Sequence, residues 1–201
     1  MASTAVDFWF DPVCPWAWLT SRWLIEAAIA RDLDVRWHLM SLYFLNAERE
    51  MSADHRAGHF TGLRALRVIA AARAEHGDEA VPRLYTAFGE AWHVRREARD
   101  DSTLSRMLEA ATLPGTLARA ADDGQWDDVV RAEHDDGVGR VGSDVGTPII
   151  SVGGRAIFGP VVTPAPRGEA AGRLWDGVAL VLSTDGFFEL KRGRDRAPIF
   201  S

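Results

Sequence analysis

Cys14 is the only thiol in this 201-residue chain, and its position favours nucleophilic chemistry. It lies between Val13 and Pro15, where an apolar segment ends and a helical pattern begins. The unpaired amide groups and the positive dipole end of a helix N-terminus stabilise a thiolate, so a cysteine there can have a pKa below the ordinary value of about 8.5. The alternative is a buried, inert cysteine, the commoner fate of a lone Cys. The helix-start position favours the reactive thiol.

Thr147-Pro148 is the second feature that bears on chemistry. The pair stands directly before an apolar segment, and proline is normally confined to the first residue of a strand or to an edge. Only about 5 to 6% of X-Pro bonds are cis, so the spacing by itself favours a trans proline at a strand start. Pairing this proline with the helix-start Cys14 is what shifts the expectation towards cis.

Histidines and arginines of the central region invite a metal or general-base role. His55 and His59 are four residues apart, a spacing that can bind a metal, but no acidic third ligand stands at a fitting distance. We therefore predict no metal site. His93 is a candidate pocket residue, with a surface position as the alternative. The residues that follow form a mixed charged cluster: Arg95, Arg96, Arg99, Glu97 and Asp100. We interpret this cluster as a solvated helix face rather than as the receptor of an anionic ligand.

These residues need a scaffold, and the first part of the chain predicts a strand, a helix and a second strand. Val6 to Phe10 alternates apolar and polar residues, and Asp11-Pro12 stops the pattern as the end of a strand would. From Pro15 onward apolar residues recur at helical spacing until near Asp32. Val35 to Leu42 again has the period of a strand. Two strands joined by a helix should lie parallel through a right-handed crossover.

The composition between Glu48 and Gly137 predicts a run of helices. This run is broken at three points: Gly77-Asp78, Asp100-Asp101-Ser102 and Leu113-Pro114-Gly115. The remaining chain returns to strands. Val145 to Val152 predicts a strand that a Gly153-Gly154 turn joins to Arg155 to Phe158, and a helical pattern follows Pro166. The order is βαβ, helical insert, ββα. We place the first half at residues 1–47, the insertion at 48–140, and the second half with its tail at 141–201.

Charge and composition exclude several classes of function. A net charge of −6 and a pI near 5.5 leave no broad basic surface, so nucleic acid is a poor candidate partner. No apolar run approaches the ~20 residues of a membrane span, and Met1 to Ala5 lacks the features of a secretory signal, so we expect a cytoplasmic protein. One cysteine excludes an intrachain disulfide and a zinc site of several thiolates. A homodimer through the insert or the Phe187-Phe188 tail is left open.

The motifs together resemble the DsbA-like branch of the thioredoxin superfamily, in which a Cys-Pro-x-Cys helix start faces a cis-proline loop and a helical domain is inserted. The chain is most similar to the mycothiol-dependent nitroreductase group. That group carries Asp-Pro-x-Cys-Pro-Trp near its start and a Phe-Glu-Leu-Lys-Arg tail, present here as Asp11 to Trp16 and Phe188 to Arg192. The resemblance covers nearly the whole chain. It implies an α/β thioredoxin fold with an all-helical subdomain.

The resemblance also implies roles for particular residues. Cys14, Pro15 and Trp16 would form the catalytic motif, with Cys14 as the attacking thiol and Trp16 stacking on the substrate. Thr147-Pro148 would be cis and present backbone groups to a bound thiol or disulfide. Two further residues would line the substrate site: Asn46 and His93. For Asn46 the alternative is a side chain that closes a turn.

Ala17 departs from the pattern, because most relatives have their second cysteine there. In a dithiol site the resolving cysteine attacks the mixed disulfide from within the chain. With Cys-Pro-Trp-Ala an external thiol must do so. We therefore predict a monothiol cycle in which a low-molecular-weight thiol, mycothiol or glutathione, releases Cys14 after reduction of a disulfide, nitro or related small-molecule substrate.

Two other functions remain open. In the first, Cys14 takes the role of the serine of kappa-type glutathione transferases and 2-hydroxychromene-2-carboxylate isomerases and activates a bound thiol without forming an adduct. The absence of a second cysteine also permits a redox-inactive thioredoxin-fold binding module. A thiol with an ordinary pKa would favour this last reading.

Overall fold

A strand, a helix and a strand open the fold, as predicted. The computed structural model describes residues 3–200, beginning with β1 (Thr4–Phe10), α1 (Pro15–Arg31) and β2 (Leu33–Leu39). The two strands are parallel neighbours, paired from Thr4 with Leu33 to Phe10 with Leu39. β2 ends earlier than predicted, because Ser41 caps a short helix, α2 (Leu42–Leu45), by accepting a hydrogen bond from the Phe44 amide.

The second half adds an antiparallel hairpin and a helix. β3 (Ile149–Val152) and β4 (Arg155–Phe158) are joined at Gly153 and Gly154, whose φ angles of 58° and 82° suit the predicted two-residue turn. β3 pairs antiparallel with β1, so the sheet order is β2-β1-β3-β4. α7 (Gly168–Ser183) follows, and its predicted apolar stripe is buried in large part.

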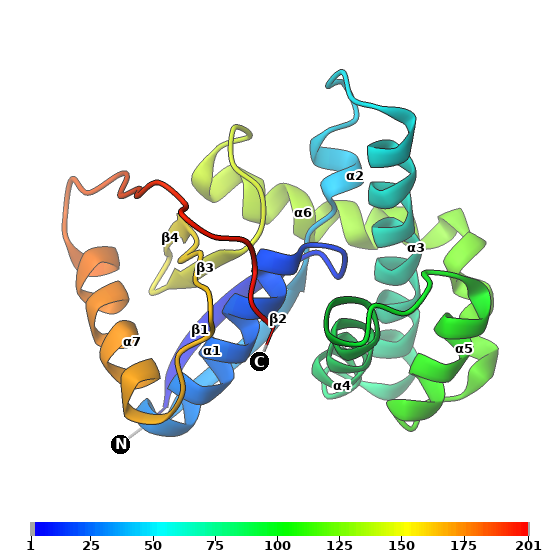
Figure 1. The fold of residues 1–201 in the computed structure, drawn as a ribbon, viewed down its shortest axis with the longest axis horizontal. Coiled ribbons are helices and arrows are strands. Elements are labelled where there is room, and N and C mark those ends of the chain that lie inside the picture. The colour runs from blue at the N-terminus through cyan, green and yellow to red at the C-terminus, as the bar shows by residue number, and fades with distance from the viewer. Residues whose placement is uncertain (1–2, 201) are drawn as a thin grey trace.

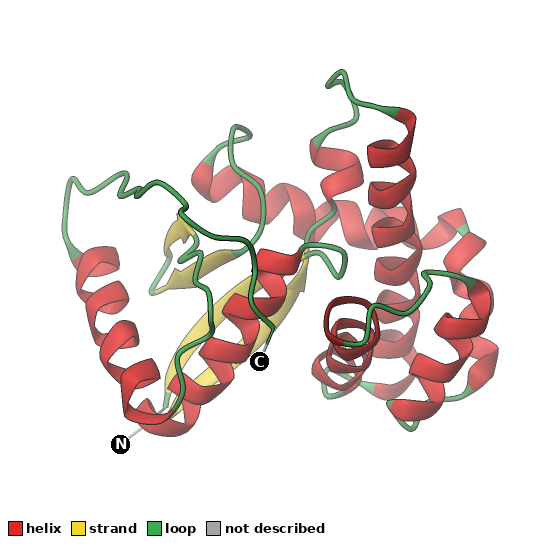
Figure 2. Ribbon diagram, in the orientation of Figure 1, coloured by secondary structure: helices red, strands yellow, loops and turns green. Residues whose placement is uncertain are grey.

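A helical insert lies between β2 and β3 in sequence, and α3, α4 and α5 stand to one side of the continuous sheet, as Figures 1 and 2 show. Its elements are α3 (Ala53–His76), α4 (Ala80–Gly89), a π-helix η1 (Glu90–Val94), α5 (Asp101–Ala110), two 3-10 helices, η2 (Gly115–Asp122) and η3 (Gly124–Trp126), and α6 (Asp127–Val141). The predicted breaks are confirmed: Gly77 ends α3 with a positive φ, Asp100 caps α5, and Pro114 precedes η2.

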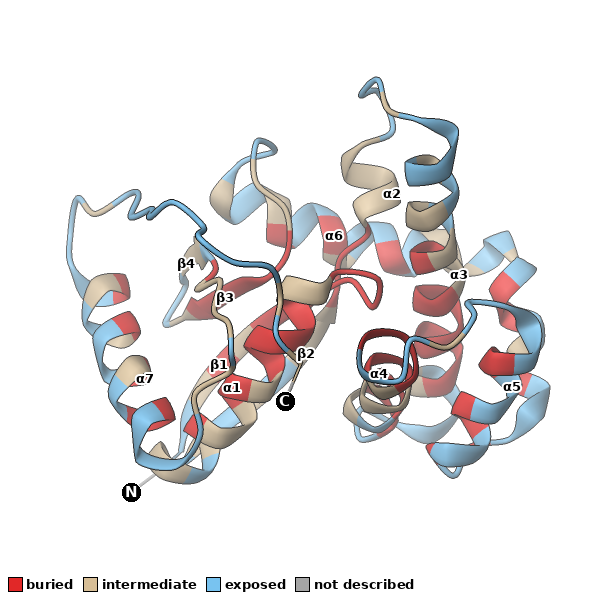
Figure 3. Cartoon of the chain, viewed as in Figure 1, coloured by how far each residue is buried: buried red, intermediate tan, exposed pale blue. Residues whose placement is uncertain are grey.

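Helices cover both faces of the sheet. Trp23 of α1 packs against Trp175 of α7 and donates its Nε1–H to Ala171 O, which ties these two helices together on one face. On the other face Trp9 donates to Glu133 O of α6. Gly137 of α6 leaves room for the Trp9 ring, because an added Cβ would lie 2.7 Å from it. Many of the buried residues lie along α1, along α3 and in the two central strands of the sheet, β1 and β3 (Figure 3). The predicted thioredoxin-type α/β fold with a helical insert is confirmed.

None of the helices within residues 3–200 has the length and apolar character that crossing a membrane requires.

Candidate active site

Cys14 occupies the N-cap position of α1, as predicted. Its φ and ψ of −80° and 112° are non-helical, and Pro15 follows as the first helical residue. The Sγ atom accepts a hydrogen bond from the Ala17 amide at 3.4 Å, and the Cys14 amide donates to Asp11 O at 3.0 Å. The residue that replaces the second cysteine of related sites therefore supplies a backbone donor to the sulfur.

Thr147 closes the opposite side of the sulfur. The Thr147–Pro148 peptide bond is cis, as the family resemblance implied. The Cys14 thiol donates a weak hydrogen bond to Thr147 O, with a sulfur-to-oxygen distance of 3.5 Å. The Thr147 hydroxyl is buried, and while the thiol keeps its proton no residue within 3–200 forms a hydrogen bond with its Oγ1, so this hydroxyl is available to a thiolate. Two segments 133 residues apart in sequence thus meet at one thiol.

The expected low pKa of Cys14 is wrong for this structure. The residue is only 7% exposed, and burial raises the pKa of its thiol above the ordinary value. The Thr147 side chain and the Ala17 amide oppose the rise, while the negative charge of Asp11 adds to it. Removing water from around a thiolate outweighs the few donors that the helix start offers. The thiol is therefore mainly protonated at neutral pH in this structure.

Asp11 holds the motif loop in place, a role that neither the strand end nor the family motif predicted. Its carboxylate is fully buried and accepts hydrogen bonds from the Val13 amide at 3.0 Å and the Leu42 amide at 2.7 Å. Gly62 of α3 packs against it, since an added Cβ would lie 2.6 Å from Oδ1. Burial raises the pKa of Asp11 to about 7. The sequence shows that the motif contains an aspartate, but it does not show that this aspartate is buried.

His93 lies against the motif loop rather than at the surface. It is 5% exposed, and its Nε2 is 2.8 Å from Pro12 O, so the ring must donate there. Burial lowers the pKa of His93 to about 4, helped by the positive charge of Arg99. The neutral ring stacks between Trp18 and Phe200. The structure brings His93 to the site, and its role in binding a substrate stays a prediction.

Trp16 is half-buried beside the motif and is covered by the C-terminal tail, residues 184–200. The Arg194 guanidinium lies over the Trp16 ring, 4.6 Å from its centroid. Within the described chain this tail forms neither helix nor strand, and it passes in front of α1 (Figure 1). The predicted stacking surface of Trp16 is therefore occupied by another part of the same chain.

Asn46 is engaged within its own turn. Its Nδ2 donates to Leu42 O at 2.8 Å, and its Oδ1 accepts from Arg49 at 3.3 Å, at the end of α2. This is the turn-closing geometry considered as the alternative, and a role in the pocket stays a prediction. In the charged cluster after His93, Arg95 pairs with Glu97 at 2.5 Å, but the predicted helix face is wrong, because the chain between η1 and α5 is irregular. Among residues 3–200 no group of three His, Cys, Asp or Glu side chains could hold a metal ion.

Comparison with known proteins identifies similar chains. A family model described as mycothiol-dependent nitroreductase Rv2466c, Rv2466c-like, matches residues 13–192. The uncharacterized protein Rv2286c of Mycobacterium tuberculosis (strain ATCC 25618 / H37Rv) is 29% identical over 198 residues, which cover 98% of this chain and 85% of that protein. The similarity thus spans nearly all of this chain and most of that protein.

Solved structures share the fold at low sequence identity. A probable DsbA oxidoreductase, SCO1869 of Streptomyces coelicolor, superposes with a TM-score of 0.61 at 17% identity, covering 98% of this chain and 93% of that one. The cytosolic disulfide reductase DsbM of Pseudomonas aeruginosa gives 0.56 at 19% identity, covering 88% and 99%. Both likenesses concern the fold.

Proposed function

Because the chain belongs to the Rv2466c-like family of mycothiol-dependent nitroreductases, we propose that it is a monothiol oxidoreductase with Cys14 as its nucleophile. Mycothiol or glutathione would be the thiol cosubstrate, and a small-molecule disulfide or nitro compound the substrate. The observation that carries the proposal is the helix-start sulfur between the Ala17 amide and Thr147, with no second cysteine in the chain. We place the reaction in the cytoplasm, where such thiols are kept reduced.

With a disulfide substrate the cycle has two exchange steps. The Cys14 thiolate attacks one sulfur of the substrate, which forms a mixed disulfide and releases the other half as a thiolate. The thiolate of the cosubstrate then attacks the substrate sulfur of that mixed disulfide and regenerates Cys14. Since Ala17 supplies an amide but no thiol, the second step depends on the concentration of the external thiol.

With a nitro substrate the same two thiols supply the electrons. Cys14 and one cosubstrate thiol lose two electrons and two protons and become a mixed disulfide. The nitro group gains both and becomes a nitroso group and water. A second cosubstrate thiol then releases Cys14 as in the disulfide reaction.

Both reactions require the buried thiol to ionise. Because desolvation raises the Cys14 pKa, the covering segments must move before the proton can pass to solvent. Once water reaches the sulfur, the Ala17 amide and the Thr147 hydroxyl lie where they stabilise the thiolate. The same movement then opens the site to the substrate and allows the Cys14 thiol to ionise.

Intact-mass analysis tests the proposal. Protein incubated with oxidised mycothiol, or with oxidised glutathione, should gain a single adduct that maps to Cys14, and added reduced thiol should remove it. Cys14→Ser should gain none. Absence of an adduct on the wild-type chain at every pH from neutral to alkaline would sink the monothiol cycle.

The buried, protonated thiol favours one second candidate. A Cys14 that keeps its proton can donate a hydrogen bond to the thiol of a bound cosubstrate, as expected for a kappa-type glutathione transferase or 2-hydroxychromene-2-carboxylate isomerase. A serine donates equally well. Transferase or isomerase turnover that survives Cys14→Ser, with no adduct on the wild type, would support this function over the redox cycle.

A further inference from the structure

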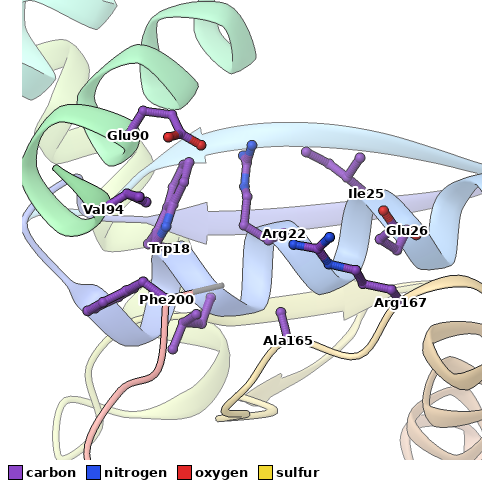
Figure 4. A pocket seen from close by; sticks show the side chains of 10 residues that line it. Trp18, Arg22, Ile25, Glu26, Glu90, Val94, Ala165, Arg167 and Phe200 are labelled. Carbon is purple, nitrogen blue, oxygen red and sulfur yellow. The ribbon is translucent and has the colours of Figure 1, made fainter.

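A groove of about 490 Å³ runs along the outer side of α1, within the range of about 300–1,000 Å³ that small-molecule sites occupy. Figure 4 shows its walls. Apolar surface comes from Trp18, Ile25, Val94 and Phe200, and Arg22 lies between them. The groove begins one helical turn from the candidate nucleophile, since the Trp18 amide donates to Cys14 O at 3.1 Å.

The ring of Phe200 forms the end of this groove that lies nearest the Cys14 motif, and it stacks on His93. His93 lies between Trp18 and Phe200, with ring centroids 6.2 Å and 5.8 Å away and interplanar angles of 28° and 20°. These are the separations of offset-stacked aromatic pairs. Because His93 also donates to Pro12 O, the stack stands directly on the loop that carries Cys14.

The ring of Phe200 is carried by a segment with little structure of its own. The tail contacts the rest of the chain through Arg194 on Trp16, through the Ile199 amide, which donates to Thr163 Oγ1 at 2.7 Å, and through Phe200. Further back along the tail the Phe188 side chain is 90% exposed. A segment with so few buried contacts opens at low free-energy cost.

Arg22 adds a polar preference to the groove. Its guanidinium stacks on Trp18 at 4.0 Å and donates to Thr86 Oγ1, but its buried Nη2 has no hydrogen-bond partner among residues 3–200. An acceptor on a ligand would supply one. The groove is lined by two arginines and two glutamates, Arg22 and Arg167 with Glu26 and Glu90, so their charges balance. An uncharged acceptor, such as a nitro group, therefore fits better than a carboxylate.

We propose that this groove binds an uncharged planar aromatic ligand with a hydrogen-bond acceptor, and that the Phe200 ring occupies its stacking position until the ligand displaces it. The inference rests on the proposed function, since it names the substrate class of the same thiol site. The tail that covers Trp16 leaves together with Phe200. Entry of the ligand thereby uncovers the loop that carries Cys14. The Cys14 side chain, which is buried as a neutral thiol before the ligand binds, then becomes accessible.

Binding of 4-nitrobenzyl alcohol, measured by titration calorimetry on the full chain, tests the displacement. Phe200→Ala removes the competing ring and should tighten binding about fivefold. Phe188→Ala, the same change at an exposed position of the same tail, should leave the affinity as it is. The rate at which iodoacetamide alkylates Cys14 should rise roughly threefold or more in Phe200→Ala alone. Unchanged or weakened binding in Phe200→Ala would overturn the proposal.

Arg22→Leu tests the acceptor. It should weaken binding of 4-nitrobenzyl alcohol roughly fivefold and leave the affinity for benzyl alcohol unchanged. Equal losses for both probes would refute the assigned role of Arg22. Repeating the titrations in Cys14→Ser separates the two proposals, because this binding needs no thiol. If the Phe200 effect persists there while wild type forms no mixed disulfide, the ligand site stands and the redox function fails.

Discussion

The buried side chains of Asp11 and His93, which both lie next to Pro12, should make the free energy of unfolding depend on pH in opposite directions. Burial raises the pKa of Asp11 from 3.8 to about 7. Burial lowers the pKa of His93 from 6.5 to about 4. As the pH rises from 3.8 towards 7, the unfolded chain has lost the Asp11 proton that the folded protein keeps, so the free energy of unfolding falls. Between pH 4 and 6.5 the unfolded chain holds a His93 proton that the folded protein lacks, so the His93 contribution to the free energy of unfolding rises with pH.

The two contributions are similar in size. At about 1.36 kcal/mol for each pKa unit, the Asp11 shift amounts to about 4 kcal/mol and the His93 shift to about 3 kcal/mol. Neither is reduced much by solvent screening, because both side chains are buried. They nearly cancel from pH 4 to 6.5, and Asp11 alone then lowers the stability up to about pH 7.

Asp11→Asn removes one of the two titrations. His93 is then unopposed, and the free energy of unfolding should climb by about 3 kcal/mol relative to the wild-type profile between pH 4 and 6.5. The amide also places an N–H group against the amide of Val13 or Leu42, which lowers stability by about 1–3 kcal/mol at every pH. The changed slope, and not this constant offset, is the diagnostic result.

Urea unfolding followed by tryptophan fluorescence, at intervals from about pH 4 to pH 8, measures the profile. Asp78→Asn, at an exposed aspartate, is the matched control and should run parallel to the wild type. The three proteins share every titratable group except Asp11 and Asp78, so the difference between the Asp11→Asn and wild-type profiles isolates Asp11. Parallel profiles for Asp11→Asn and the wild type would show that the Asp11 carboxyl is already ionised at low pH and would refute the reasoning.

Three further changes test the site and the packing around it. Ala17→Cys should form an intrachain disulfide with Cys14 and shorten the life of any mixed disulfide, which intact-mass analysis would show. Ala17→Ser is the control, and a mixed disulfide that persists in Ala17→Cys would count against the assigned geometry. Thr147→Val removes the hydroxyl beside the sulfur and should raise the Cys14 pKa further, seen as a shift of the alkylation-rate profile to higher pH; an unshifted profile would exclude that contribution. Gly89→Ala would place a Cβ 2.0 Å from the Trp18 ring and should lower stability by about 1–3 kcal/mol in urea unfolding, whereas Gly139→Ala, with nothing within 4 Å, should not; equal effects would contradict the packing of α4 on α1.

The fold could be predicted well because its signals are local. Pro15 at a helix start, the positive φ that Gly153 and Gly154 tolerate, and the capping side chain of Asp100 each act within a few residues. The end of β2 was misplaced, because the Ser41 cap competes with a strand pattern that continues beyond it. Such competition is settled by which hydrogen bonds the surrounding structure leaves free.

The site was predicted less completely than the fold. Cys14 and Thr147 meet as the family resemblance implied, and His93 reaches the motif loop. The role of Asp11 was not predicted, and the tail was expected as a motif or a dimer contact rather than as a cover for Trp16. Neither feature has a local signature, because each depends on contacts between segments far apart in the chain.

The sequence by itself determined which atoms are available: one thiol, no second cysteine at position 17, and a helix start that aims backbone amides at the sulfur. Only the tertiary structure decided the protonation state of that thiol. Helix dipoles and N-cap donors are built by neighbouring residues, whereas desolvation comes from residues distant in sequence, here Thr147 at the sulfur itself and Gly62 of the insert against Asp11 and Val13 of the motif loop. Because burial outweighs the local donors, the pKa of the Cys14 thiol lies above its ordinary value, although the helix start by itself would lower it.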